Sequence, residues 1–270
     1  MHIFFAWKPI DTVKRTFLAT TRYAENVFCL PFRFYYKSRF TLLNVNFLDE
    51  VYVTDTFFPN VDDHDGYTCA QIYCGKKYSF TCVFGMKTDS EMPGTLMDFV
   101  CTFGVMKGLF YDNAKVHTGA AVKDILQQYN IDDMHSDPLQ QNHNPSKRLI
   151  KEVKATTNMV MDRTGAPPWI WLLFMVFIVY IIKCLEVARL DQRTPTEVDF
   201  VITPDIRTLL LFSFWYPVLY LAENDKSPNR KEKSGRFSEI YKNKGDSLTF
   251  CIWTDNTQEL ILRSFVRSIY

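Results

Sequence analysis

A run of seventeen residues without a charge, at positions 166–182 (APPWIWLLFMVFIVYII), constrains the fold of this chain more than any other feature. A segment of this length is either a core helix of a large domain, apolar on every side, or a membrane span at the lower limit of length. Lys183 follows it, and neither flank carries the strong excess of positive charge that orients membrane spans. The residues therefore favour a buried core helix and leave a membrane span as the alternative.

The composition is that of a globular protein, with 47% hydrophobic and 23% charged residues among 270. The net charge is only +1, but the bases are unevenly placed. Residues 1–47 and residues 226–244 each contain seven bases and two acids. Two such segments can contact phosphates, or can be ordinary solvated surfaces, and their charge alone does not separate these interpretations.

The cysteines and histidines indicate neither a zinc site nor a secreted protein. The seven cysteines form no CxxC pair, and the five histidines form no HxxxH or HExxH pair, so we expect no zinc site. The start MHIFFAWKP lacks the basic residues, the long apolar run and the cleavage site of a secretory signal. These features are typical of a reducing, intracellular compartment.

The middle of the chain alternates between strand-like and helix-like segments. EVYVTDTFF, TCAQIYCG and YSFTCVFG are rich in β-branched and aromatic residues and are separated by DDHDG and GKK, so they predict antiparallel strands with turns. The strand-like GLFY lies further on. Helices are predicted at residues 90–103, 120–129, 146–162 and 168–188, with a short strand at 131–134. This succession predicts a mixed α/β domain.

The two ends of the chain differ from this middle part. Residues 1–47 form a basic segment with a helix predicted near residues 11–26. PVLYLA, GRFSEIY, LTFCIW and LILRSFVR lie beyond about residue 200 and predict a small β-rich module. We therefore divide the chain into a basic N-terminal segment (1–47), an α/β core (48–190), and a linker with a C-terminal β module (191–270).

Two acids lie where a divalent ion can bind. Asp55 is inside the first strand and shares its face with Val51 and Val53, and Asp112 ends the GLFY strand. Carboxylates on adjacent strands can share metal ions that support phosphoryl transfer. An Asp at the end of a strand is also an ordinary turn residue. These residues leave both interpretations open.

The chain resembles the integrase region of Ty1/copia-type retrotransposon polyproteins. TDTFF, LFYDNAKVHTG and NPSKRLIKEVK resemble the three acid-bearing motifs of retroviral-type integrases. Further likeness lies in DSEMPGTLMDFV, TNMVMDRTGAPPWIWLL, TPDIRTLLLF, FWYPVLY, EKSGRFSEI and LTFCIWTDNTQELILRSFVR, and extends over about residues 44–267. The resemblance implies a ribonuclease-H-like fold, with a mixed five-stranded sheet flanked by helices and followed by the small β module. It also implies that residues 166–182 form a core helix and not a membrane anchor.

The resemblance implies a site in which one ligand is changed. The family has a Glu on the helix after the polar loop, in a pattern like NPAER, whereas this chain has Lys147, 35 positions after Asp112 as in the family. Glu152 is a poor substitute, because five residues turn a helix by about 140° beyond a full turn. Asp55 and Asp112 would hold Mg²⁺ or Mn²⁺. An ammonium at position 147 adds positive charge there, so we expect impaired catalysis.

The expected function is therefore that of an integrase-like DNA-binding protein that acts by metal-dependent strand transfer. With Lys147 at the third acidic position, its catalysis is expected to be impaired. By the same resemblance, it would act on DNA as a homo-oligomer, in the nucleus or a virus-like particle, without a membrane partner. The residues expected to contact DNA are Asn113, Lys115, Lys154 and Arg163. The alternative is a non-catalytic nucleic-acid-binding or scaffolding remnant, which Lys147 and the lack of a preceding His/Cys module favour. If Lys147 is not the third position, Glu152 or Asp137 becomes the candidate.

Overall fold

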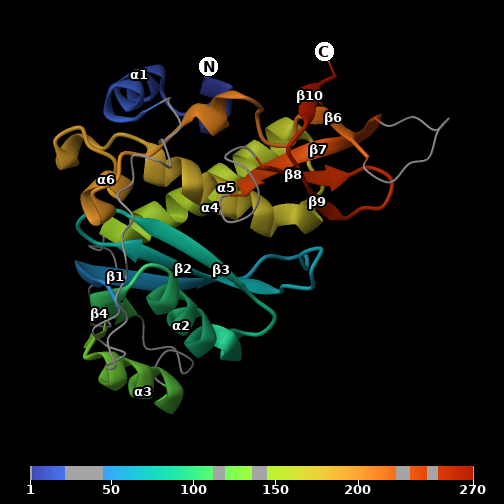
Figure 1. The fold of residues 1–270 in the computed structure, drawn as a ribbon. Coiled ribbons are helices and arrows are strands. Elements are labelled where there is room, and N and C mark those ends of the chain that lie inside the picture. Colours follow the sequence, from blue (N-terminus) through green and yellow to red (C-terminus); the bar gives the residue numbers. More distant parts are fainter. Residues whose placement is uncertain are drawn as a thin grey trace.

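The chain folds into an α/β core with a small β-sheet beside it (Figure 1). The structure is a computed structural model that describes residues 2–21, 45–111, 119–135, 145–222, 232–241 and 249–269. The core has three layers, with helices on both faces of a central sheet. The expected ribonuclease-H-like architecture, with the β-rich module after it, is confirmed.

The central sheet has five strands in the order β3-β2-β1-β4-β5. β1 pairs with β2, and β2 with β3, in antiparallel fashion, whereas β4 is parallel to both β1 and β5. This mixed order is the ribonuclease-H-like one, in which an antiparallel hairpin unit is extended by two parallel strands. The strands are β1 (Phe47–Phe57), β2 (Cys69–Gly75), β3 (Thr81–Met86), β4 (Val105–Tyr111) and β5 (Asp132–His135).

Helices cover both faces of this sheet, which explains why β2 is buried at every position. Ile72 and Cys74 point into one apolar cluster, and Tyr73 points into the other, as the alternation of a strand requires. The first cluster contains side chains of α4 (Pro145–Thr164) and α5 (Trp171–Cys184). The second contains those of α2 (Met92–Thr102) and α3 (Ala120–Tyr129), with the 3-10 turn η4 (Asp89–Glu91) before α2.

The charge-free segment forms the 3-10 turn η6 (Pro168–Ile170) followed by α5, whose side chains are largely buried in the first cluster. The helix ends at Cys184, four residues before the predicted end at residue 188. Of the described helices, none alone has the length and apolarity of a membrane span, although the bent pair Pro168–Cys184 and Ala188–Phe200, 48° apart, has them together.

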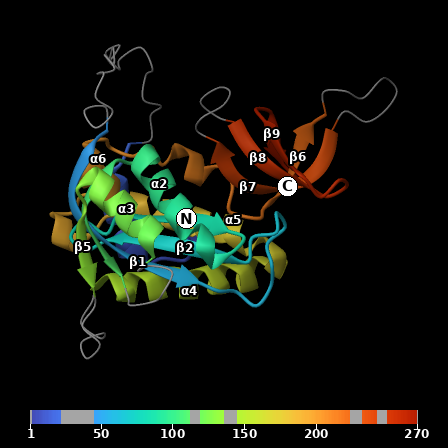
Figure 2. The same cartoon turned by 90° about the horizontal axis from the view of Figure 1, so that it is seen from below.

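The C-terminal module is a second, wholly antiparallel sheet in the order β10-β6-β7-β8-β9. The predicted strand LILRSFVR is in fact two strands, β9 and β10, at opposite edges of this sheet. Because two residues join them, the edges must approach each other and the sheet is strongly curled. Figure 2 shows it beside the core. The strands are β6 (Pro217–Leu221), β7 (Glu232–Tyr241), β8 (Thr249–Thr254), β9 (Leu260–Arg263) and β10 (Val266–Ser268).

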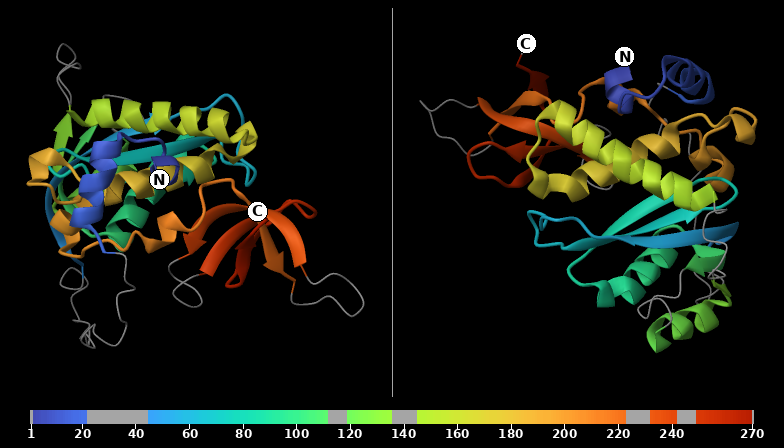
Figure 3. Two further views of the ribbon diagram at one scale, coloured as in Figure 1. Left: turned by 90° about the horizontal axis from the view of Figure 1, so that it is seen from above. Right: turned by 180° about the vertical axis from the view of Figure 1, so that it is seen from behind.

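The described part of the N-terminal segment packs on the core. It contains the 3-10 turn η1 (His2–Phe5) and α1 (Ile10–Ala19), on the side of α4 and α5 that faces away from the sheet (Figure 3). Phe5 is fully buried in the first apolar cluster. Arg15 Nε lies 2.9 Å from Glu186 Oε2, just beyond α5. The remaining short elements are η7 (Ala188–Leu190), α6 (Pro195–Phe200) and η8 (Arg207–Leu210).

Candidate active site

Asp55 projects from β1 toward α4. On this strand Tyr52 packs in the α2 cluster, so the odd-numbered side chains face the other way, toward α4 and α5. Phe57 confirms this direction, since its ring contacts that of Trp171 at 5.5 Å. The Asp55 side chain is 41% exposed, and Oδ2 accepts a hydrogen bond from Lys154 Nζ at 3.0 Å. A carboxylate is therefore held at the accessible end of the central strand.

Lys154, predicted to contact DNA, is thus placed directly against the predicted metal ligand Asp55. Its ammonium also lies 5.5 Å from the centre of the Phe57 ring, a cation–π distance. Strand β1 supplies both partners, two residues apart on one face. The Lys154 side chain is 28% exposed, so it remains within reach of solvent.

Helix geometry relates Lys154 to position 147, where the family resemblance predicts an acid. α4 begins at Pro145, so position 147 lies in its first turn. Seven residues turn a helix by about 700°, which is nearly two full turns, and advance it by about 10.5 Å. Position 147 therefore lies on the same face of α4 as Lys154, the face toward Asp55. The side chain of Lys147 is outside the described residues.

Glu152 lies on another side of α4. Its carboxylate is paired with Lys8 Nζ of the N-terminal segment. Residues 152 and 154 are about 200° apart on the helix, so Glu152 faces away from Asp55. This placement agrees with the expectation that Glu152 is a poor substitute for an acid at position 147.

The other predicted residues are not brought to Asp55 by the described part of the chain. Arg163 is about 180° round α4 from Lys154, and its guanidinium lies 4.9 Å from the centre of the Trp7 ring. Asp112, Asn113, Lys115 and Asp137 lie outside the described residues. β4 does end at Tyr111, immediately before Asp112, and is the parallel neighbour of β1.

No protein-family model and no curated protein matches the sequence. Among solved structures, a simian T-cell lymphotropic virus intasome in complex with PP2A regulatory subunit B56 gamma is similar, at 11% identity and a TM-score of 0.46, over 82% of this chain and 82% of that chain. The HTLV-2 integrase catalytic core domain in complex with magnesium, in a trimeric form, is similar at 14% identity and a TM-score of 0.44, over 56% and 96%. At such identities neither structure assigns a role to any residue of this chain.

A second group of possible metal ligands was missed by the sequence reasoning. Asp63, His64 and Asp65 lie in the loop between β1 and β2, and each offers a ligand atom within 4.8 Å of the others. The signal was present in DDHDG, but the pattern is also that of a turn. A search for histidine pairs such as HxxxH or HExxH does not find this group, because its possible ligands are three consecutive loop residues.

Two more carboxylates lie toward the opposite end of β1, the buried Glu50 and the partly exposed Asp199. Glu50 accepts hydrogen bonds from the backbone N–H groups of Lys77 and Tyr78, at 2.7 and 2.9 Å. Asp199, in α6, accepts one from the Tyr52 hydroxyl at 3.3 Å. Burial and then the charge of Glu50 raise the pKa of Asp199 to about 7. Burial also raises the pKa of Glu50. Five strand residues, about 17 Å, separate Glu50 from Asp55, so this pair belongs to a different site.

Proposed function

We propose that this chain is an integrase-like DNA-binding protein of a copia-type retrotransposon, impaired in metal-dependent strand transfer because Lys147 occupies the third acidic position. The observation that carries the proposal is the contact between Asp55 and Lys154. It joins the central strand to the face of α4 on which position 147 lies. The motif order in the sequence and the ribonuclease-H-like sheet support the same assignment.

The donor set at this edge suits a hard divalent cation only in part. Asp55 offers carboxylate oxygens of the kind that Mg²⁺ and Mn²⁺ prefer, and Asp112, which follows β4, would offer a second carboxylate. The family's third carboxylate is replaced by Lys147. When bound, the ion would supply Lewis acidity to the phosphodiester. Ammonium groups at positions 147 and 154 oppose its binding by charge repulsion.

The chain's own bases would hold the DNA. Lys154 neutralises Asp55 in the structure, and a phosphate that approaches the same edge offers it a second anionic partner. Asn113 and Lys115 follow the second acid in sequence and would contact the same DNA segment. Arg163 would contact a different segment, because it lies on the opposite side of α4. Binding through such contacts weakens as salt rises.

A strand-transfer assay tests the proposal, with the unmodified chain beside Lys147→Glu on a short duplex in Mg²⁺ or Mn²⁺. We expect only the variant to join DNA. Arg148→Glu is the matched control, since it makes the same charge change about 100° away on the helix and should stay inactive. Asp55→Asn in the Lys147→Glu background should abolish joining. If the unmodified chain is already active, the third-ligand assignment is wrong, and Glu152 or Asp137 must be tested in its place.

The second candidate function is a non-catalytic DNA-binding or scaffolding protein of the same fold. The ammonium of Lys154 at Asp55 favours it, since charge is already neutralised there without a metal. Fluorescence polarisation with labelled duplex separates the candidates. If the unmodified chain and Lys147→Glu both bind DNA in a salt-dependent way and neither joins it, the scaffolding function is supported. We further propose that the chain acts as a homo-oligomer inside the cell, in the nucleus or a virus-like particle, which sedimentation with and without DNA and localisation of a tagged chain would test.

A further inference from the structure

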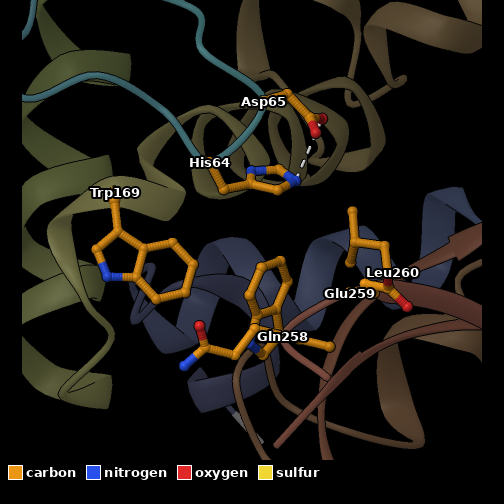
Figure 4. A pocket seen from close by; sticks show the side chains of 7 residues that line it. His64, Asp65, Trp169, Gln258, Glu259 and Leu260 are labelled. Atoms are coloured by element: carbon orange, nitrogen blue, oxygen red, sulfur yellow. Dashed lines mark ion pairs between the residues drawn. The ribbon is translucent and has the colours of Figure 1, made fainter. Parts of the chain in front are cut away.

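A cavity of about 480 Å³ lies at the joint between the core and the C-terminal sheet (Figure 4). Core residues form one wall and residues of the C-terminal sheet and its β8–β9 turn form the other. The lining residues are His64, Asp65, Trp169, Trp253, Gln258, Glu259 and Leu260. Asp65 lines one wall and Glu259 the other, and none of the described residues that line the cavity is a Lys or Arg. The cavity therefore attracts cations.

His64 lies between two carboxylates, and its buried Nδ1 has no hydrogen-bond partner among the described residues. Nδ1 lies 2.8 Å from Oδ2 of Asp63, and Nε2 lies 3.2 Å from Oδ2 of Asp65. A neutral imidazole carries a proton on one nitrogen and a lone pair on the other. One of the two nitrogens then presents its lone pair to a carboxylate oxygen, which repels it. A proton or a metal ion between the two atoms removes this repulsion.

The surroundings distinguish the two nitrogens. Asp63 is buried, with a side chain only 1% exposed, and accepts backbone hydrogen bonds from Leu172 at 3.3 Å and from Asp65 at 3.4 Å. Its Oδ2 lies beside Nδ1, which is buried and has no hydrogen-bond partner among the described residues, so the carboxylate can orient the ring through its charge. The 61% exposed Asp65 and Nε2 lie on the cavity side. Histidine ligands of metals are usually oriented in this way, by a carboxylate on the second nitrogen.

The spacing on the cavity side suits a tetrahedral ion. Ligands at about 2.0–2.2 Å from a tetrahedral zinc ion lie about 3.3 Å from each other. Nε2 of His64 and Oδ2 of Asp65 are 3.2 Å apart. Glu259 lines the opposite wall, and its backbone is fixed by hydrogen bonds with Thr254.

We propose that this cavity binds a divalent transition-metal ion of the zinc type. Nε2 of His64 and the Asp65 carboxylate are its protein ligands, and water completes the shell. Asp63 is a positioning residue. An imidazole ligand selects such an ion over Mg²⁺, which separates this site from the oxygen donors around Asp55.

The proposal is tested by titrating zinc chloride into the full chain, freed of metal beforehand and kept in excess Mg²⁺, by calorimetry. We expect one equivalent to bind. Asp65→Asn should abolish zinc binding. Because the Asp65 side chain is exposed, this substitution should leave the fold intact, so a loss of binding would report on the metal site itself. Asp63→Asn should weaken binding about 10–100-fold. Zinc at 100 times its Kd should raise the folded-to-unfolded ratio about 100-fold, and Asp65→Asn should remove that gain.

Two controls locate the ion. Asp55→Asn should bind zinc as the unmodified chain does, and so should Asp191→Asn, an exposed acid in the linker that follows the core. Trp253 lies 5.2 Å from His64, edge to face, so Co²⁺ in place of zinc should quench tryptophan fluorescence. Absence of zinc binding, or binding that Asp65→Asn leaves intact, overturns the proposal. Binding that Asp55→Asn removes overturns it too, because the ion is then at the other site.

Discussion

Asp55 and Lys154, 99 residues apart in the chain, are joined by a 3.0 Å contact between Oδ2 and Nζ that connects the central strand to α4. Both side chains are partly exposed, so the pair contributes little to stability, about 0–1 kcal/mol. Its significance is positional. The contact defines which face of α4 meets the end of β1, and position 147 lies on that face two turns earlier.

Replacing Lys154 separates its structural role from its proposed DNA contact. Lys154→Gln should change the free energy of unfolding by no more than ~1 kcal/mol. It should weaken DNA binding and lower the slope of log affinity against log salt by about 1. Lys107→Gln is the matched control, since Lys107 forms a comparable 3.1 Å pair with Asp49 at the other end of the strands. Equal effects of the two substitutions on the salt slope would contradict the DNA contact.

Asp199 should make the protein less stable as pH rises. Its pKa is raised to about 7, first by burial and then by the charge of Glu50, from an ordinary value of 3.8. Between these values the folded state binds more protons than the unfolded state, so stability is full below about pH 4 and is lost as pH rises through 7. Because Asp199 is partly exposed, we expect a loss of roughly 1–3 kcal/mol.

Urea denaturation at pH 5 and pH 8 measures this loss. Asp199→Asn should remove most of the difference and stabilise the chain at pH 8. The raised pKa of Glu50 acts in the same direction, so a residual dependence should remain. Asp191→Asn serves as the control at an exposed position. A pH difference that Asp199→Asn does not alter would show that Asp199 is ionised normally.

The order of the elements was predictable where periodicity is strong and local. The helix at Ala120–Tyr129 agrees with the predicted range at both ends. Long-range contacts account for the differences. The helix predicted to continue to residue 188 ends at Cys184, because Glu186 contacts α1 instead of continuing the helix. Its carboxylate pairs with Arg15, and its backbone N–H donates a hydrogen bond to Thr16 Oγ1 at 3.0 Å. A local pattern contains no information about α1.

The candidate site was predictable to a similar extent. Asp55 could be assigned to a strand face from its sequence neighbours, and its direction toward α4 is found in the structure. Pairing with Lys154 was not predictable, because it depends on how a helix 99 residues away crosses the strand. The His64 group was missed because a turn and a loop metal site have the same composition. The division of LILRSFVR into β9 and β10 was not predictable either, because the two strands pair at opposite edges of the C-terminal sheet.

Two glycines should respond oppositely to alanine. Gly104 precedes β4 with φ of +124°, and a Cβ there would lie 2.4 Å from the carbonyl oxygen of Asn46. Gly104→Ala should therefore destabilise the chain by at least ~2 kcal/mol. Gly94 is in α2 with nothing within 4 Å of an added Cβ, so Gly94→Ala should stabilise by about 0.5–1 kcal/mol. Thermal and urea unfolding of both variants would check the signs, and destabilisation by both would contradict this account.

The described part of the N-terminal segment, residues 2–21, should be part of the folded core. Phe5 is fully buried among side chains of α4 and α5, whereas Leu18 of α1 is 87% exposed. Phe5→Ala should cost about 3–5 kcal/mol of unfolding free energy, and Leu18→Ala should cost little, because it removes no buried surface. Urea denaturation followed by tryptophan fluorescence would measure both. If Phe5→Ala left the main transition unchanged, the segment would be an independent arm, and its bases, Lys8 and Arg15 among them, would be free to contact DNA instead of Glu152 and Glu186.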